Sequence, residues 1–167
     1  MRKNFINTGA PFERMLEQTH TSYLAKKRAK IEKVAPPTRM VRRGAFWIPL
    51  HMENPFLDFV GVWSEAGCRA LMMEAKSTRT PRLAVGSNDG LNERQWRALR
   101  DWHASGCAAC VLWEFLGVVK LIMVEDVHEQ IKSRKSLAWT DCKCEVRRGI
   151  GFVHYDWLTT LRERMPV

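Results

Sequence analysis

Apolar residues recur at intervals of three and four near the start of the chain. They lie between Ala10 and Lys33 and comprise Phe12, Met15, Leu16, Tyr23 and Leu24, with Thr19 at an intermediate position. This spacing places them on one face of a helix. Gly9 and Pro11 are typical of a helix start, and the prolines within the run 35–38 cannot continue a helix. The pattern therefore predicts a helix over residues 10–33.

Short apolar runs farther along the chain predict strands. Runs 57–63 and 68–76 flank a turn at 64–67, and runs 108–115 and 118–124 flank Gly117. Residues 78–90 have the composition of a loop. Helical patterns cover 91–106, with Asn92 as N-terminal cap, then 126–139, and 154–165 with Asp156 as cap. This mixed order favours an α/β fold, with a central mixed sheet flanked by helices.

The segment from Met40 to Met52 has β-forming residues but no clean period. Gly44 and Pro49 interrupt it, so we expect an extended or hairpin segment that protrudes. Its aromatic residues Phe46 and Trp47 stand near Arg42 and Arg43 and are suited to stack on nucleic-acid bases. The alternative is that they fold back and pack on the domain.

Composition narrows the class of protein. The chain has 167 residues, 46% apolar and 27% charged, which is typical of one globular domain spanning residues 1–167. The longest uncharged apolar stretch, 106–113, is far shorter than a membrane span, and the first sixteen residues lack the apolar core of a signal peptide. We therefore expect a cytoplasmic protein that does not enter a membrane.

The five cysteines are expected to be free thiols, because the cytoplasm is reducing. Cys107 and Cys110 lie in an apolar run and are interpreted as small core residues. Cys142 and Cys144 form a second close pair, so a zinc site built from the four stays an open alternative.

The net charge of +9 and the pI of about 9.7 favour a polyanionic partner, because each neutralised phosphate releases condensed counterions. The basic residues are unevenly placed, and nucleic acid is the partner we expect. The candidate contacts include Arg39, Arg42, Arg43, Arg79 and Arg82.

Charged residues interrupt the strand predicted at 68–76. Glu74 and Lys76 are two residues apart, so they project from the same face of a sheet. An unpaired charge on a covered face is costly, so the two should either pair or perform chemistry. Asp58, set among apolar residues of the preceding strand, can lie beside Glu74 if the strands form a hairpin. Two carboxylates held that close favour a hard divalent cation, and Lys76 would stand next to a water on that cation.

A structural interpretation of the same residues is also open. Glu74 and Lys76 can form a solvated pair on an edge strand while Asp58 caps a turn. In that case the chain is a basic DNA-binding protein without catalysis.

The pattern Asp58, then Glu74-Ala75-Lys76, resembles the PD-(D/E)XK nuclease superfamily, and within it the RecU-type Holliday junction resolvases. Four segments carry the resemblance in order: the opening helix 8–24 with its Gly-x-x-Phe-Glu start, the strand "FLDFVGVW", the strand "MMEAKST" and the helix "LNERQWRAL". The resemblance implies a restriction-endonuclease-like fold and a metal-dependent endodeoxyribonuclease.

The resemblance also implies roles for particular residues. Asp58 and Glu74, with the Ala75 carbonyl, would bind Mg²⁺, which Mn²⁺ can replace, and Lys76 would serve the attacking water. Glu13 would complete the acidic cluster and Gln95 would orient water or backbone; the residues alone also allow Glu13 to be an exposed first-turn acid and Gln95 an exposed helix residue.

The family further implies a homodimer that resolves four-way or other branched DNA, with a projecting stalk, here residues 39–53. The stalk's candidate contacts with the junction are Arg42, Arg43, Phe46 and Trp47, and Arg39, Arg79 and Arg82 are further candidate DNA contacts. An alternative is another nuclease of the superfamily that acts on duplex DNA.

Overall fold

The computed structural model describes residues 9–51, 57–87, 90–131, 136–151 and 153–165. In these ranges the helices are α1 (Gly9–Ala25), α2 (Glu93–Ala104), α3 (Val124–Ile131) and α4 (Trp157–Arg164). The strands are β1 (Ala29–Lys33), β2 (Thr38–Arg43), β3 (Phe46–His51), β4 (Phe59–Trp63), β5 (Arg69–Thr78), β6 (Arg82–Ala84), β7 (Ala108–Phe115), β8 (Val118–Met123) and β9 (Ser136–Ala138).

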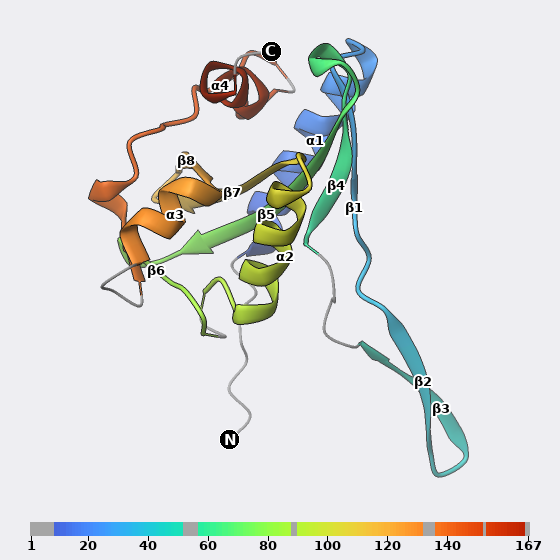
Figure 1. The fold of residues 1–167 in the computed structure, drawn as a ribbon. Coiled ribbons are helices and arrows are strands. Elements are labelled where there is room, and N and C mark those ends of the chain that lie inside the picture. Colours follow the sequence, from blue (N-terminus) through green and yellow to red (C-terminus); the bar gives the residue numbers. More distant parts are fainter. Residues whose placement is uncertain (1–8, 52–56, 88–89, 132–135, 152, 166–167) are drawn as a thin grey trace.

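Five strands form a central mixed sheet in the order β1-β4-β5-β7-β8. β5 and β7 are parallel, and the other neighbours are antiparallel. The parallel pair requires a crossover, which α2 supplies between β5 and β7 (Figure 1). The predicted α/β fold with a central mixed sheet flanked by helices is confirmed.

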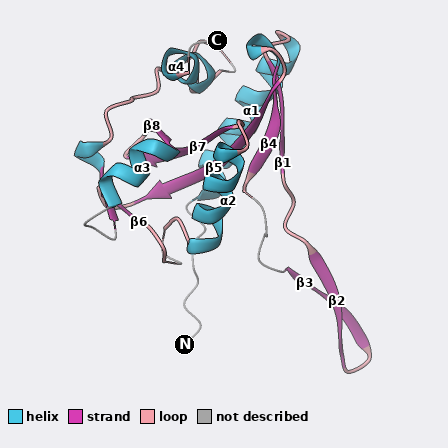
Figure 2. Ribbon diagram, viewed as in Figure 1, coloured by secondary structure: helices cyan, strands magenta, loops and turns pink. Residues whose placement is uncertain are grey.

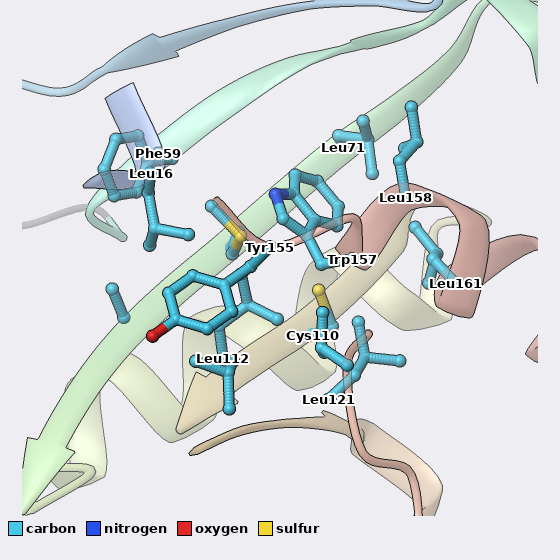
Figure 3. Close-up of a cluster of buried hydrophobic side chains, with 14 of the residues drawn as sticks. Leu16, Phe59, Leu71, Cys110, Leu112, Leu121, Tyr155, Trp157, Leu158 and Leu161 are labelled. Carbon is cyan, nitrogen blue, oxygen red and sulfur yellow. The ribbon is translucent and has the colours of Figure 1, made fainter. Parts of the chain in front are cut away.

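Each face of the sheet is covered by its own apolar cluster. On one face Leu71, Met73 and Ala75 of β5 pack with residues of α1 and α4, and part of this cluster is drawn in Figure 3. On the other face Met72 packs with the cluster that contains Trp96 and Leu99 of α2. The two-residue period of β5 thus separates α1 from α2, which decides on which side each site residue can lie.

β2 and β3 form an antiparallel hairpin that projects away from the sheet and its helices (Figures 1 and 2). It covers most of the predicted stalk, residues 39–53; Met52 and Glu53 lie outside the described residues. Phe46 and Trp47 are 73% and 64% exposed, so the alternative that they fold back and pack on the domain is wrong.

The helix predicted over residues 10–33 is wrong beyond Ala25. The chain turns after α1, where Lys27 has a φ of 56° and the Arg28 N–H donates to the Tyr23 carbonyl at 2.9 Å. Residues 29–33 then form the edge strand β1, antiparallel to β4. Backbone pairing with β4 outweighs the helix propensity of this lysine-rich segment, whose charged side chains suit a sheet edge.

The helix predicted over residues 126–139 is also wrong in its second half. α3 ends at Ile131, residues 132–135 lie outside the described part, and β9 follows. β9 pairs with β6, which lies within the predicted loop 78–90. Leu137 and Leu83 face each other in this pair and are fully buried, so burial of two leucines favours a strand pair here.

The cysteines Cys107 and Cys110 are buried core residues, as predicted, and all five thiols are free. Cys142 packs in the cluster on the α2 side of the sheet, whereas Cys144 contacts the cluster on the α1 side. Within the described ranges no three His, Cys, Asp or Glu side chains are grouped to hold a metal ion. The zinc alternative therefore gains no support.

That residues 1–167 form a single domain stays a prediction. Among the helices of the described segments, none is both long enough and apolar enough to cross a bilayer.

Burial of His20 predicts a specific loss of stability in acid. This side chain in α1 is 3% exposed between the rings of Phe59 and Trp157, and burial lowers its pKa from 6.5 to about 3. Below pH 6.5 the His20 imidazole binds a proton in the unfolded chain but stays neutral in the folded chain. The free energy of unfolding therefore falls by up to about 1.4 kcal/mol for each unit that the pH decreases. By pH 4.5 this amounts to about 2–3 kcal/mol.

Urea unfolding at pH 7 and pH 4.5 measures this loss. We expect the variant His20→Phe, which keeps a ring at this position, to lose about 2–3 kcal/mol less than the wild type between the two pH values. Equal losses in both proteins would show that His20 does not carry this acid sensitivity.

Candidate active site

Glu74 and Lys76 project together from β5 toward the α2 side of the sheet. Glu74 is fully buried, and Lys76 Nζ lies 2.7 Å from its Oε1. The Lys76 side chain is 21% exposed, so it reaches from the buried carboxylate toward solvent. The interpretation of the two as a solvated pair is therefore wrong, because one partner is wholly covered.

Asp58 lies beside Glu74 because β4 ends next to it. β4 pairs with β5 only as far as Phe59 opposite Met73, which leaves the edge of β5 unpaired by β4 from Glu74 onward. Asp58 occupies this position: its Oδ2 accepts the Ala75 N–H at 2.9 Å, and its own N–H donates to Glu74 Oε2 at 3.2 Å. The predicted proximity of the two carboxyl groups is thus present, although Asp58 precedes the strand rather than lying within it.

The two carboxyl groups strongly influence each other. Burial, followed by repulsion from Asp58, raises the pKa of Glu74 to about 8. Burial also raises the pKa of Asp58, against the opposing effects of the Ala75 N–H and the Lys76 charge. The two side chains are close enough to share a hydrogen bond. A proton or a cation is therefore needed to hold them together.

The donor set at this edge suits a hard divalent cation. The N–H and C=O of one residue in a strand point to the same side, and the Ala75 N–H points to Asp58. The Ala75 carbonyl therefore faces the same unpaired edge as the Asp58 carboxylate, next to Glu74. Mg²⁺ commonly binds one or two carboxylates and completes its shell with further oxygen atoms and waters. These residues fit that requirement.

Gln95 connects the start of α2 to the buried carboxylate. Its Oε1 accepts the Asn92 N–H at 3.1 Å, and Asn92 Oδ1 accepts the Gln95 N–H at 2.9 Å, which forms a capping box. Its Nε2 donates to Glu74 Oε1 at 2.5 Å. The amide is thus fixed at both ends, and the alternative of an exposed helix residue is wrong.

The two halves of this capping box predict different mutant behaviour. Asn92→Ala removes a cap but leaves the contact with Glu74, so we expect a loss of about 1 kcal/mol in stability with little change in catalysis. Gln95→Ala removes the cap and also leaves Glu74 with one hydrogen-bond donor fewer. We therefore expect a loss of about 1–3 kcal/mol in stability together with a clear loss of metal-dependent activity. Thermal unfolding and cleavage assays on both variants test this difference. Equal activity of the two variants would contradict the positioning role of Gln95.

Glu13 does not join Asp58 and Glu74 in one cluster. α1 packs on the opposite face of the sheet from the Glu74 side chain, and no three acidic groups converge within the described ranges. Glu13 still lies close enough for its charge to contribute to the raised pKa of Asp58. Its Oε2 lies 2.8 Å from Lys33 Nζ, which also contacts Glu17 Oε1 at 2.9 Å.

Lys33 is the charged neighbour that sequence reasoning missed. It lies on β1 opposite Phe59, the residue after Asp58, and its side chain ties α1 to this end of the sheet. The sequence signal for it is the alternation in residues 29–33, a segment that falls within the helix predicted over residues 10–33.

The basic candidates fall into two groups. Arg39, Arg42 and Arg43 lie on β2 of the hairpin, where Trp47 is opposite Arg42 and Phe46 is opposite Arg43. Each face of the hairpin tip therefore carries one arginine and one aromatic ring. Arg79 and Arg82 are exposed and follow β5 beyond Lys76, with Arg82 at the start of β6.

Comparison with known proteins finds similarity among solved structures. A scan against protein families and a search of curated proteins find no match. The solved structure of Hjc, a Holliday junction resolvase from the archaeon Archaeoglobus fulgidus, is similar with a TM-score of 0.48 and 18% identity. The match covers 80% of this chain and 91% of that one. The resemblance to the RecU type stays a prediction. At this degree of similarity the assignment of site residues rests on their geometry alone.

Proposed function

We propose that this chain is a magnesium-dependent endonuclease that hydrolyses phosphodiester bonds in branched DNA. The observation that carries the proposal is the buried pair Asp58 and Glu74 at an unpaired strand edge, with Lys76 Nζ 2.7 Å from Glu74. Burial raises the pKa of both carboxyl groups, and repulsion from Asp58 raises that of Glu74 further, a perturbation that is typical of functional sites.

The residues of this site divide the chemical work. Asp58, Glu74 and the Ala75 carbonyl would hold Mg²⁺, or Mn²⁺ in its place, which supplies Lewis-acid polarisation of a phosphate oxygen. Lys76, partly exposed beside Glu74, would orient a water for in-line attack and offset negative charge on the phosphate. Gln95 would keep the Glu74 carboxylate in one orientation.

The substrate follows from charge and from the hairpin. A net charge of +9 supports binding to phosphates. The hairpin β2–β3 places two exposed aromatic rings and three arginines away from the domain (Figure 1). Exposed rings can stack on the faces of bases, and such faces become accessible at a branch point, where the stacking of the arms is interrupted, but not inside a duplex. We infer a homodimer, because two related cuts on opposed strands require two sites related by a twofold axis.

Competition binding tests the choice of substrate. A labelled four-way junction is bound in the presence of a chelator, which prevents cleavage, and is displaced by unlabelled junction or by linear duplex of the same sequence. We expect the junction to compete at least about tenfold better, which corresponds to about 1.4 kcal/mol. Equal competition would instead favour a nuclease of ordinary duplex, and absence of any DNA binding would reject the proposal.

The aromatic residues at the hairpin tip should provide part of this preference. Phe46→Ser combined with Trp47→Ser is expected to weaken junction binding about 5- to 100-fold, since base stacking contributes about 1–3 kcal/mol per base. The melting temperature should hardly change, because both rings are largely exposed. The matched control is Ile48→Ser with Leu50→Ser, farther from the tip on the same strand. Unchanged junction binding in the tip variant would show that the tip of the hairpin does not contact the junction.

A further inference from the structure

A basic cavity is lined by residues of α4, of the loop before it and of the turn that follows α1. α4 and this turn lie at the opposite end of the molecule from the hairpin (Figure 1). The volume of the cavity is about 320 Å³. Among its described lining residues four are cationic, namely Lys26, Arg28, Arg147 and Arg148, and Asp156 is the only acidic one. The cavity therefore has an excess of positive charge.

The charge of Arg28, which together with Asp156 forms the floor of this cavity, is already neutralised within the protein. Arg28 donates to Asp156 Oδ1 at 3.0 Å and to Glu65 Oε1 at 3.1 Å, and Asp156 also accepts the Tyr23 and Thr159 hydroxyls. Burial alone would raise the pKa of Asp156, but these hydrogen bonds outweigh it and lower that pKa. Asp156 is thus paired with Arg28 and does not offset the charge of the other cations, which form the rim of the cavity, namely Lys26, Arg147 and Arg148.

The rim carries the remaining cations on a closely folded loop. The Asp156 N–H donates to the Arg147 carbonyl at 3.0 Å, and Arg148 forms an antiparallel bridge with Tyr155. A Cβ at Gly149 would lie 2.2 Å from the Val153 carbonyl, so the loop closes on itself only with glycine there. The backbone at Arg147 and Arg148 is therefore fixed by these contacts before any ligand arrives.

The side chains of the rim are accessible to a ligand. Arg147 is 80% exposed, and its contact with Glu163 is 3.8 Å long, which is a weak surface pair. Lys26 is exposed on the facing turn. Lys26 and Arg147 thus line the cavity as exposed cations, beside the paired Arg28 and Asp156.

We propose that this cavity binds a phosphate of the DNA backbone and forms a second anchor for an arm of the substrate. The inference rests on the proposed function. Six residues of extended chain, from Asp58 to Ser64 beside Arg28, separate the candidate active site from the cavity. At about 3.3 Å per residue this is about 20 Å, which is close to six base pairs of duplex. The anchor would therefore hold the arm well away from the cut.

The salt dependence of DNA binding tests this anchor. Each phosphate contact contributes about 0.9 to the slope of log K against log salt concentration. We expect Lys26→Ala with Arg147→Ala to reduce the slope by about 1 to 2 for a four-way junction, while the cleavage rate at saturating protein stays unchanged. The matched control, Lys143→Ala with Arg162→Ala, removes the same charge from exposed positions outside the cavity and should leave the slope closer to that of wild type.

The outcomes separate this inference from the proposed function. If the wild type cleaves the junction and the cavity and control variants have the same slope, the anchor is wrong and the function stands. If the wild type does not bind DNA, both are wrong. Calorimetric titration of the wild type with inorganic phosphate covers the other source of the same ligand chemistry. Phosphate binding that Lys26→Ala with Arg147→Ala abolishes, with no change in the DNA slope, would assign the cavity to a free phosphate.

Discussion

Glu74→Gln is expected to abolish magnesium-dependent cleavage and, at neutral pH, to stabilise the fold. The amide removes one of the two carboxylates that would hold the metal. Loss of several kcal/mol of transition-state stabilisation corresponds to at least about a thousandfold lower rate. The change in shape is minimal, so DNA binding should survive.

The gain in stability follows from the direction of the pKa shift. Glu74 has a pKa of about 8 in the folded chain and an ordinary value of 4.5 when unfolded. Between these values the folded chain holds a proton that the unfolded chain has lost, so the stability of the wild type falls as pH rises from 4.5 to 8. Gln cannot ionise, so the variant avoids this loss, which reaches about 3 kcal/mol at pH 7.

Chemical unfolding at pH 5 and pH 7, without metal, measures this difference. The variant should gain on the wild type as pH rises, and its nuclease activity should be absent at both values. A variant that is destabilised to the same extent at pH 5 and pH 7 would show that the Glu74 carboxyl group is not strained by burial.

Lys76→Met is expected to lower the cleavage rate by about 10² to 10⁴ without weakening the attachment to DNA. The methionine keeps the length of the side chain on β5 but removes the only ammonium group in contact with Glu74 among the described residues. Breaking a buried charge pair usually costs about 3–5 kcal/mol. Here the cost should be smaller, because Glu74 can take up a proton once Lys76 is lost.

The comparison with Glu74→Gln sharpens this test. In single-turnover assays over a range of Mg²⁺ concentrations, Lys76→Met should keep the half-saturating Mg²⁺ concentration of the wild type, whereas Glu74→Gln should stay inactive at every concentration. The double variant should be about as inactive as Glu74→Gln alone, because residues that act as a unit are not additive. Full activity of Lys76→Met would remove Lys76 from the chemistry and leave it as a structural partner of Glu74.

The central part of the site could be predicted because its signal is local. Glu74 and Lys76 follow the two-residue period of one strand. Asp58 stands out in the sequence because it is an acidic residue within an apolar run. The position of Asp58 just before β4 could not be predicted to the residue, because it depends on where β4 stops pairing with β5.

The missed elements depend on partners that are distant in the chain. Residues 29–33 form a strand only because β4 lies beside them, and Lys33 is near Asp58 for the same reason. Residues 136–138 form a strand only because Leu83 covers Leu137. Local patterns were compatible with a helix in both segments, and tertiary pairing decided against it.

Glu13 illustrates a different limit of sequence reasoning. Its place in the opening helix matched the family motif, but the alternation of β5 puts α1 on the face opposite Glu74. Neither the motif nor the helical period indicates on which face of the sheet a helix packs.

Incubation of the wild-type chain with an end-labelled four-way junction, in magnesium and in chelator, is the most direct test of the proposed nuclease. We expect paired nicks near the branch point in magnesium, none in chelator, and none with Glu74→Gln in either. Tight binding of the junction with no cleavage in magnesium or manganese would contradict it, and would leave Asp58, Glu74 and Lys76 as a buried structural cluster in a DNA-binding protein.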